Sequence, residues 1–176
     1  MRPAPISILR VYLAGPDVFF RDALETTQRR KEFLSGLKME GVFPLDAQCD
    51  PSAATAASIF KANCALIDSC QGLLANITPF RGPSADVGTV WEIGYARGQG
   101  KPVAAYSANT AIYREKVFHG GWSDAPHARH DKHGHEIEHF GDIDNLMVTQ
   151  SVIAICQTFE EAAQALRRFL NQADRI

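Results

Sequence analysis

Three polar residues at intervals of three could form the centre of a reactive site. Thr89 and Glu92 share one face of a helix predicted over residues 86–98, and Asp86, at or before its N-cap, can point toward the same rim. Glu92 lies between two apolar residues, so its carboxylate can serve as a nucleophile, as a general base or as a structural acid. Acids are also common in early helix turns, and Asp86 equally suits the N-cap of this helix. The spacing alone leaves these roles open.

Further polar groups follow or precede predicted strands. Asp17 and Phe19 lie in the loop after the first strand, where we expect substrate contacts, because ligands bind at the carboxyl ends of parallel strands. Tyr12 is expected to point inward from that strand, with a hydroxyl that needs a polar partner if buried. Asp68, at the end of an Ala-rich helix, is a candidate third acid at this edge or a solvated helix-end residue.

The segment from Gly82 to Gly88 does not match either common nucleotide-binding loop. It has neither the GxGxxG pattern nor a Walker lysine. A phosphate resting on the amides of the following helix would be repelled by the adjacent Asp86. We therefore expect this region to take the neutral end of a nucleoside rather than a phosphate.

All six histidines fall between His119 and His139. Such density can indicate a metal site, but the spacing is not HExxH and no cysteine is close. We expect a polar surface loop, no bound metal and no cofactor. The chain has four cysteines without a CxxC pair, which favours reduced thiols in a cytosolic protein rather than cysteine catalysis. They are Cys49, Cys64, Cys70 and Cys156.

The elements that position these residues alternate between strands and helices. Strands are predicted at residues 8–14, 42–45, 72–77 and 102–106, and helices at 22–39, 53–69 and 86–98. Residues 110–142 read as a long irregular loop with one helix at 111–118, and Thr158 with Glu161 forms a capping box before a last helix at 162–170. This alternation predicts an α/β fold, a Rossmann-like (flavodoxin-like) three-layer sandwich with a mostly parallel sheet, in a single domain over residues 1–176.

Composition narrows the class of partner. The 176 residues carry a formal charge of −2, so no overall positive field would attract nucleic acid. Hydrophobic residues make up 45% and charged residues 22%, as in globular proteins. No secretory signal and no apolar run of about 18 residues is present. We expect a cytoplasmic protein with no membrane partner and a small neutral substrate.

Four motifs together resemble the nucleoside 2-deoxyribosyltransferase family. They are Tyr12-Leu-Ala-Gly-Pro-Asp-Val-Phe19, Asn76-Ile-Thr-Pro-Phe80, Pro83-Ser-Ala-Asp-Val-Gly-Thr-Val-Trp-Glu-Ile-Gly-Tyr-Ala96 and Asp144-Asn-Leu-Met147. The resemblance covers most of the chain, and the block from Pro83 to Ala96 is its most specific part.

The resemblance implies a function and roles for several residues. It implies transfer of 2-deoxyribose from a 2′-deoxynucleoside to a free nucleobase, with Glu92 as nucleophile oriented by Tyr12. Asp68 and Asp86 would be proton donors or anchors. Asn145 and Met147 would enter from a neighbouring subunit of a homo-oligomer with shared active sites.

Other classes of function stay open at this stage. A deoxynucleotide N-hydrolase would keep the fold and the glutamate but needs a phosphate pocket, for which the loop after the first strand offers only Arg21. A non-catalytic nucleotide-sensing module would keep Glu92 as a cap or ion-pair partner. The Gly-Thr-x-x-Glu string is also similar to that of phosphoribohydrolases, although their preceding Gly-Gly loop is missing.

Overall fold

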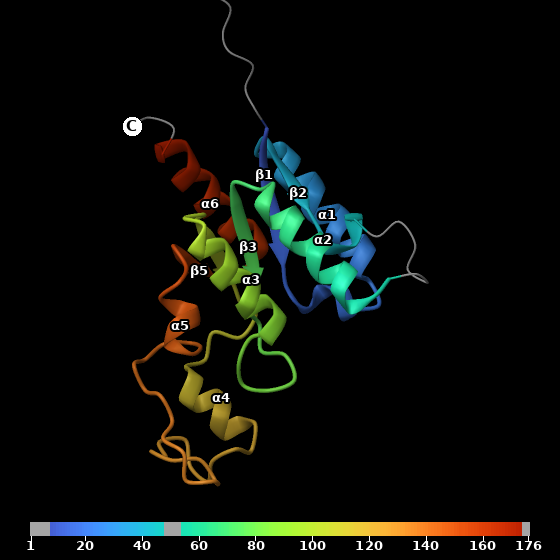
Figure 1. The fold of residues 1–176 in the computed structure, drawn as a ribbon. Helices are drawn as coiled ribbons and strands as arrows, with labels where there is room; N and C mark the ends of the chain where they lie inside the picture. Colours follow the sequence, from blue (N-terminus) through green and yellow to red (C-terminus); the bar gives the residue numbers. More distant parts are fainter. Residues whose placement is uncertain (1–7, 48–53, 174–176) are drawn as a thin grey trace, which may run out of the picture.

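A five-stranded parallel sheet organises the chain in a computed structural model that describes residues 8–47 and 54–173. The strand order is β2-β1-β3-β4-β5 (Figure 1). The strands are β1 (Leu9–Ala14), β2 (Met39–Val42), β3 (Gly72–Asn76), β4 (Val103–Tyr106) and β5 (Ala154–Cys156). The chain leaves β1 toward β2 on one side and returns to β3 on the other. The strand order therefore switches between β1 and β3, where α/β sheets bind ligands.

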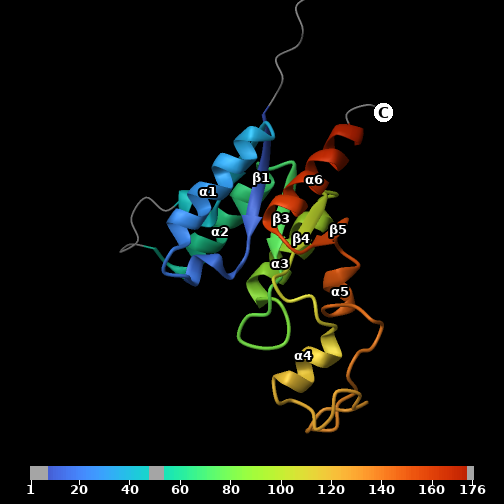
Figure 2. The same cartoon turned by 180° about the vertical axis from the view of Figure 1, so that it is seen from behind.

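Helices cover both faces of the sheet and complete the three predicted layers. Helices α2 (Ala56–Asp68) and α3 (Val87–Gly98) lie on one face, in front of the strands in Figure 1. Helices α1 (Ala23–Gly36) and α6 (Phe159–Ala173) lie on the other face, which Figure 2 turns toward the viewer. The α/β fold expected from the alternation of elements is thus confirmed.

The alternation of side chains along β1 builds a core on each face. Tyr12 and Ala14 belong to the buried cluster under α2 and α3, whereas Val11 and Leu13 belong to the cluster under α1 and α6. Successive side chains of a strand point to opposite faces, so a strand between two helical layers must be apolar on both. Tyr12 is the polar exception, and its side chain is directed toward the α2 and α3 layer.

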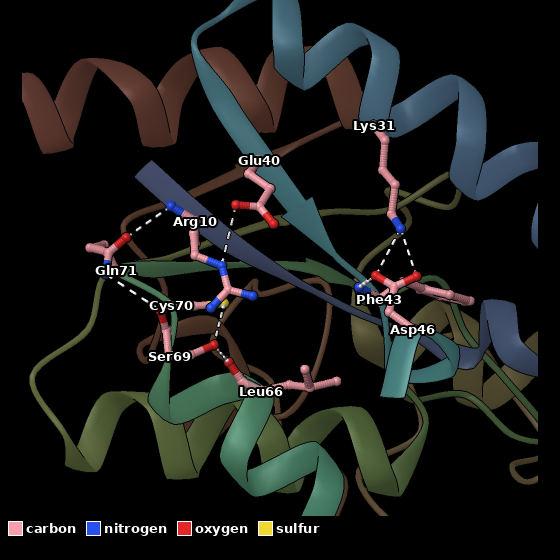
Figure 3. Close-up of polar contacts among 9 residues, drawn as sticks. All are labelled: Arg10, Lys31, Glu40, Phe43, Asp46, Leu66, Ser69, Cys70 and Gln71. Atoms are coloured by element: carbon pink, nitrogen blue, oxygen red, sulfur yellow. Dashed lines mark hydrogen bonds and ion pairs between the residues drawn. The ribbon is translucent and has the colours of Figure 1, made fainter. Parts of the chain in front are cut away.

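Polar contacts fix both ends of the strands. Figure 3 shows the Arg10 guanidinium beside the Glu40 carboxylate, with 3.3 Å between Nε and Oε2. The backbone N–H of Arg10 donates to Gln71 Oε1 over 2.8 Å, which ties β1 to the segment before β3. On the α1 side, Lys31 reaches both oxygens of Asp46, at 2.6 and 2.7 Å. The Arg10 contacts lie where the strands begin, whereas the Lys31–Asp46 pair holds the segment that follows β2, at the carboxyl ends of the strands.

The boundaries around β2 differ from the sequence prediction. The helix predicted over 22–39 ends at Gly36, and Lys38 adopts a left-handed backbone with φ of 57°, which a helix does not accommodate. The strand predicted at 42–45 is instead β2 at Met39–Val42, and Pro44–Ala47 forms the 3₁₀ turn η2. A second 3₁₀ turn, η1 (Pro16–Phe19), follows β1 and was not predicted. The start predicted for α2 at residue 53 lies outside the described residues.

The C-terminal third contains two elements that the sequence reading missed. The three-residue edge strand β5 pairs with β4, and α5 (Leu146–Thr149) is a single turn capped by Asn145. In the predicted loop, α4 (Tyr113–His119) forms close to where a helix was expected. Residues 110–142 extend past the carboxyl ends of the strands, at the bottom of Figure 1.

The remaining sequence expectations concern cysteines and membranes. Cys64, Cys70 and Cys156 are free thiols, and Cys49 lies outside the described residues. No helix in the described part of the chain has both the length and the apolar composition needed to cross a membrane.

Candidate active site

A tyrosine from a strand and a glutamate from a helix are in contact at the centre of the site. Tyr12 on β1 donates its hydroxyl hydrogen bond to Oε1 of Glu92 on α3, with 2.6 Å between the oxygens. Tyr12 is completely buried and Glu92 is half-buried. The contact spans 80 positions of sequence, and the packing of α3 across β1 creates it. The tyrosine therefore fixes one carboxylate oxygen of Glu92 and leaves Oε2 for other chemistry.

The surroundings of Glu92 raise the pKa of its carboxyl group toward neutral pH. Burial raises the pKa of Glu92 from its ordinary value of 4.5 to about 7, and the negative charge of Asp86 adds to the rise. The hydrogen bond from Tyr12 opposes it, because it stabilises the ionised carboxylate. Burial and the charge of Glu92 raise the pKa of Tyr12 far above neutrality, so Tyr12 stays protonated as the donor. Such a carboxylate is suited to act as an acid, a base or a nucleophile near pH 7.

Asp86 combines its structural role with a place in the site. Its Oδ2 accepts the backbone N–H of Thr89 over 3.0 Å and the Thr89 hydroxyl over 3.2 Å, so Asp86 is the N-cap of α3. The same carboxylate lines the cavity that contains Glu92. The N-cap role expected from the sequence is therefore confirmed, and the part of Asp86 in catalysis stays a prediction.

The cavity around Glu92 has a volume of about 360 Å³, within the range of small-molecule sites. The loop after β1, the η2 turn, α2 and the first turns of α3 enclose it, and most of its wall is apolar. Its lining residues are Gly15, Val18, Phe19, Pro44, Leu45, Ile59, Asn63, Asp86, Gly88, Thr89 and Glu92. An apolar wall with two carboxylates and one amide suits a flat, partly polar molecule.

Asn63 is a site residue that the sequence analysis missed. It lines the Glu92 cavity from α2, and its Oδ1 is buried without a hydrogen-bond partner among the described residues. A buried amide oxygen without a partner is costly unless a ligand satisfies it. The signal was present in the sequence: Asn63 lies four residues from both Ile59 and Ile67, on the inward face of α2.

Phe19 forms one wall of this cavity and is held in place by stacking. Its ring lies parallel to that of Phe80, with 5.5 Å between centroids. The guanidinium carbon of Arg81 lies 5.1 Å from the Phe19 centroid and 4.7 Å from that of Phe80. The loops after β1 and β3 are joined in this way at the point where the strand order switches. The expectation that Phe19 lies at the site agrees with this placement.

Asp17 lies on the other side of the same loop, away from the Glu92 cavity. It is 4% exposed and forms an ion pair with Arg30 at 3.0 Å, and Asn76 Nδ2 donates to its Oδ2 over 3.0 Å. It lines a separate cavity that Arg30 and Tyr106 share. A Cβ at Gly15 would collide with the Asp17 carboxylate, so this arrangement requires glycine there. Asp17 thus organises the loop that carries Phe19.

Asp68 is placed at the opposite edge of the sheet. It is the last residue of α2 and accepts hydrogen bonds from the Tyr95 hydroxyl at 3.0 Å and from Gln99 Nε2 at 2.7 Å. A helix that leads into a parallel strand ends where that strand begins, whereas Asp86 follows the end of β3. The structure therefore does not bring Asp68 together with Glu92.

Asn145 and Met147 do not line the Glu92 cavity of their own chain. Asn145 caps α5, accepts the backbone N–H of Met147 over 2.9 Å and donates to Glu138 over 2.6 Å. Met147 is 69% exposed. Their placement leaves an exposed apolar side chain beside a capped helix turn, on the outer surface of this chain.

The histidine-rich segment folds around an aspartate rather than around a metal arrangement. Asp131 accepts the backbone N–H groups of His133 and His135 and lies 3.2 Å from the His135 ring. These hydrogen bonds lower the pKa of Asp131. Across residues 8–47 and 54–173, no group of three His, Cys, Asp or Glu side chains is arranged to hold a metal ion.

Comparison with known proteins decides the family. The family model described as nucleoside 2-deoxyribosyltransferase matches residues 11–147, which include most of β1, both helices of the Glu92 face and the segment between them. The chain belongs to the nucleoside 2-deoxyribosyltransferase family. Members of this family are enzymes that act on nucleosides.

Individual relatives agree with the family assignment. An uncharacterized protein of Schizosaccharomyces pombe, C191.05c, is 36% identical over 139 residues, which are 74% of this chain and 66% of that protein. The match thus leaves about a third of the yeast protein uncovered. A 2-desoxiribosyltransferase from Leishmania mexicana is similar in structure, with a TM-score of 0.74, 27% identity, and coverage of 91% of this chain and 97% of that one. A 2-deoxyribosyltransferase from Bacillus psychrosaccharolyticus shares the fold, with a TM-score of 0.57, 21% identity, and coverage of 88% and 90%.

Proposed function

We propose that this protein transfers 2-deoxyribose from a 2′-deoxynucleoside to a free nucleobase through an ester on Glu92. The observation that carries the proposal is the half-buried Glu92 carboxylate, held by the 2.6 Å hydrogen bond from Tyr12 inside a cavity. Family membership and the Leishmania mexicana transferase of similar structure support the same reaction.

In the first half of the proposed reaction, Glu92 replaces the base on C1′ of the sugar. Glu92 Oε2 attacks C1′ of the sugar, the N-glycosidic bond breaks, and its electron pair leaves with the base nitrogen, which takes up a proton. Cleavage passes through an oxocarbenium-like state that a carboxylate beneath C1′ stabilises, as in retaining glycosidases. Tyr12 keeps Oε1 engaged, so that Oε2 is the attacking oxygen.

The second half returns the sugar to a different base. The acceptor nitrogen attacks C1′, the ester bond to Glu92 breaks with its electron pair returning to the carboxylate, and the acceptor loses a proton. Because the first base leaves before the second binds, the kinetics follow a ping-pong pattern. We also expect ribonucleosides to be poor substrates, since a 2′-hydroxyl would compete for the hydrogen bond between Tyr12 and Glu92.

The other polar groups of the cavity position the substrate. Asp86 presents its free oxygen beside Glu92, where it anchors a sugar hydroxyl or passes a proton to the departing base. Asn63 offers its unpaired amide oxygen to an N–H or O–H donor of the substrate. Phe19 provides an aromatic wall against which a base can pack.

A neighbouring copy of the chain completes the proposed site. Exposed apolar side chains extend over α2 and α3, where the Phe60 and Trp91 rings lie 5.1 Å apart and the Trp91 and Tyr95 rings 5.0 Å apart. Val87 and Met147 are also exposed, at 84% and 69%. Apolar area of this kind is commonly covered by another subunit. We place Asn145 and Met147 of one chain over the Glu92 cavity of the next, as the family resemblance implies.

Incubation with deoxyinosine, with and without adenine, tests this function. Transfer predicts deoxyadenosine and hypoxanthine when adenine is present, and little free base without an acceptor. Release of hypoxanthine at the same rate without adenine would instead identify a hydrolase. If neither deoxyinosine nor a pyrimidine deoxynucleoside reacts, a non-catalytic nucleotide-sensing module is the better account of this protein.

A further inference from the structure

A second cavity, distinct from the Glu92 cavity, lies between the loop after β3 and helix α4. Its volume is about 500 Å³. Three basic side chains line it, from Arg81, Lys116 and His119, together with Asn109 and Trp122, and its lining contains neither Asp nor Glu. In a chain with a formal charge of −2, a cavity whose charged lining is entirely basic is an unusual local concentration of positive charge.

Lys116 is the most informative of these residues. It is 5% exposed, and its Nζ has no hydrogen-bond partner among the described residues. Asp144 faces it, but the two Asp144 oxygens already accept the backbone N–H groups of Ala85 and Asn145. Burial lowers the pKa of Lys116, and the charge of Asp144 only partly offsets this. A buried ammonium without a partner destabilises a fold unless a ligand pairs with it.

Arg81 adds an independent observation at the same cavity. Its backbone adopts a left-handed conformation with φ of 56°, which L-residues with a Cβ rarely adopt and which is often retained at functional positions. The guanidinium stacks over Phe19 and Phe80 and makes no hydrogen bond or ion pair with another described residue. Its five N–H donors are thus available to a ligand, in the planar geometry that matches oxyanions.

We propose that this cavity binds a phosphate-type oxyanion, with Lys116 and Arg81 as its principal donors and His119 at its rim. A phosphate presents enough acceptor oxygens to satisfy an ammonium and a guanidinium together. The lining offers a cation no carboxylate, and its positive charges favour an anion over a metal ion. This site is separate from the α3 N-terminus, where Asp86 disfavours an anion.

The phosphate can come from two sources. Arg81 lines this cavity and lies over the ring of Phe19, which lines the Glu92 cavity, so a contact between two lining side chains links the two cavities. The ligand is therefore either inorganic phosphate or the phosphate of a nucleotide. The same chemistry recognises both, and binding measurements separate them.

Titration with inorganic phosphate tests the site directly. Phosphate replaces chloride at constant ionic strength, and the fluorescence of Trp122, at the cavity, is followed in a Trp91→Phe background that removes the other tryptophan. We expect saturable binding that Lys116→Met weakens about tenfold or more, because a charge-assisted hydrogen bond is lost. Arg81→Gln is expected to act in the same direction and keeps the test valid if Lys116→Met folds poorly.

Lys132→Met is the matched control, because it removes a lysine from the same segment that lies outside the cavity and pairs with Asp124. It should leave phosphate affinity unchanged. If deoxyinosine 5′-monophosphate binds more tightly than deoxyinosine and Lys116→Met abolishes the difference, the phosphate belongs to a nucleotide. If the monophosphate gains nothing while inorganic phosphate binds, the site takes the free ion. Absence of saturable phosphate binding, or equal weakening by Lys132→Met, would overturn the proposal.

Discussion

At the scale of single residues, the reactivity of the site depends on how its neighbours set the charge of Glu92. Burial and Asp86 raise its pKa to about 7, while Tyr12 works in the opposite direction. At neutral pH a large fraction of Glu92 is therefore protonated. In the proposed mechanism only the ionised carboxylate attacks C1′, so we expect the nucleophile to form as the pH rises through 7.

The two neighbours should move the pH profile in opposite directions. We expect kcat/KM for the donor nucleoside to rise with pH on an acid limb with an apparent pKa near 7. Tyr12→Phe removes the hydrogen bond that stabilises the carboxylate and shifts this limb to higher pH. Asp86→Asn removes the negative charge and shifts it to lower pH, while Asn still caps α3. Profiles that coincide for all three proteins would show that Glu92 does not control the acid limb.

The same raised pKa predicts a pH-dependent stability. Between pH 4.5 and 7 the folded protein holds a proton on Glu92 that the unfolded chain has released, so this contribution is lost as the pH rises through 7. The full difference corresponds to roughly 3 kcal/mol. We expect the Tm of Glu92→Gln, measured relative to that of wild type, to increase by roughly 5 °C or more from pH 5 to pH 8.5. Thermal unfolding of both proteins at the two pH values measures this, and an equal difference at both would contradict it.

The sequence indicated the residues around the Glu92 cavity unevenly. Spacing on one helix placed Glu92 and Asp86 together, and the inward position of Tyr12 indicated a polar partner, which proved to be Glu92. Asp68 was grouped with them although the end of a helix before a parallel strand lies at the opposite edge. Asn63 was overlooked because a single amide in an Ala-rich helix forms no motif, and its spacing from Ile59 and Ile67 indicates only that it faces inward. Whether a buried amide can contact a ligand depends on the side chains around it.

At the scale of elements, helices α2 and α3 both line the Glu92 cavity, and Asn63 is the polar residue that α2 contributes to its lining. We expect Asn63→Leu to fold with unchanged or higher Tm, because it removes a buried oxygen without a partner. Its KM should rise about tenfold, because the substrate loses one hydrogen bond. Steady-state kinetics and thermal unfolding of this variant measure both effects.

A matched change on the same helix distinguishes recognition from packing. Ile59→Leu alters the apolar lining of the cavity without adding or removing a polar group, and should change KM much less than Asn63→Leu. Equal effects of the two substitutions would mean that Asn63 acts only by filling space.

The elements themselves were predictable where their patterns were long. Alternating apolar runs and helical spacing gave β1, β3, β4 and the major helices. The strand after α1 was predicted too late in the sequence, because the helix ends early and Lys38 adopts a left-handed backbone. A lysine gives no indication of that backbone conformation in the sequence. The strand β5 has three half-exposed or exposed residues and acquires its identity from pairing with β4, so local sequence carried too little signal.

At the scale of the whole molecule, the exposed aromatic surface on α2 and α3 and the exposed Met147 lead us to a shared active site. We expect inactive Glu92→Ala and weakly active Asn145→Ala to complement each other when co-expressed. Mixed oligomers contain some sites with an intact Glu92 from one chain and an intact Asn145 from another, so activity should rise well above that of either parent. Differently tagged chains purified in tandem ensure that the assayed oligomers are mixed.

The outcome of complementation depends on where Asn145 acts. No rise in activity in oligomers shown to be mixed would place Asn145 in its own chain's pocket or outside any pocket. Asn145 also caps α5, so a second variant, Met147→Ala, keeps the test independent of the helix cap. It should complement Glu92→Ala in the same way.

The central claim is that the sugar is carried on Glu92, and trapping the ester tests it most directly. The protein is incubated with a 2-fluoro-2-deoxy nucleoside, whose fluorine slows breakdown of the intermediate, and the digested protein is then sequenced by mass spectrometry. We predict a fluorodeoxyribosyl adduct on Glu92 that is absent from Glu92→Gln and is released when an acceptor base is added. An adduct on another residue, or turnover of the nucleoside by Glu92→Gln at the wild-type rate, would contradict the account.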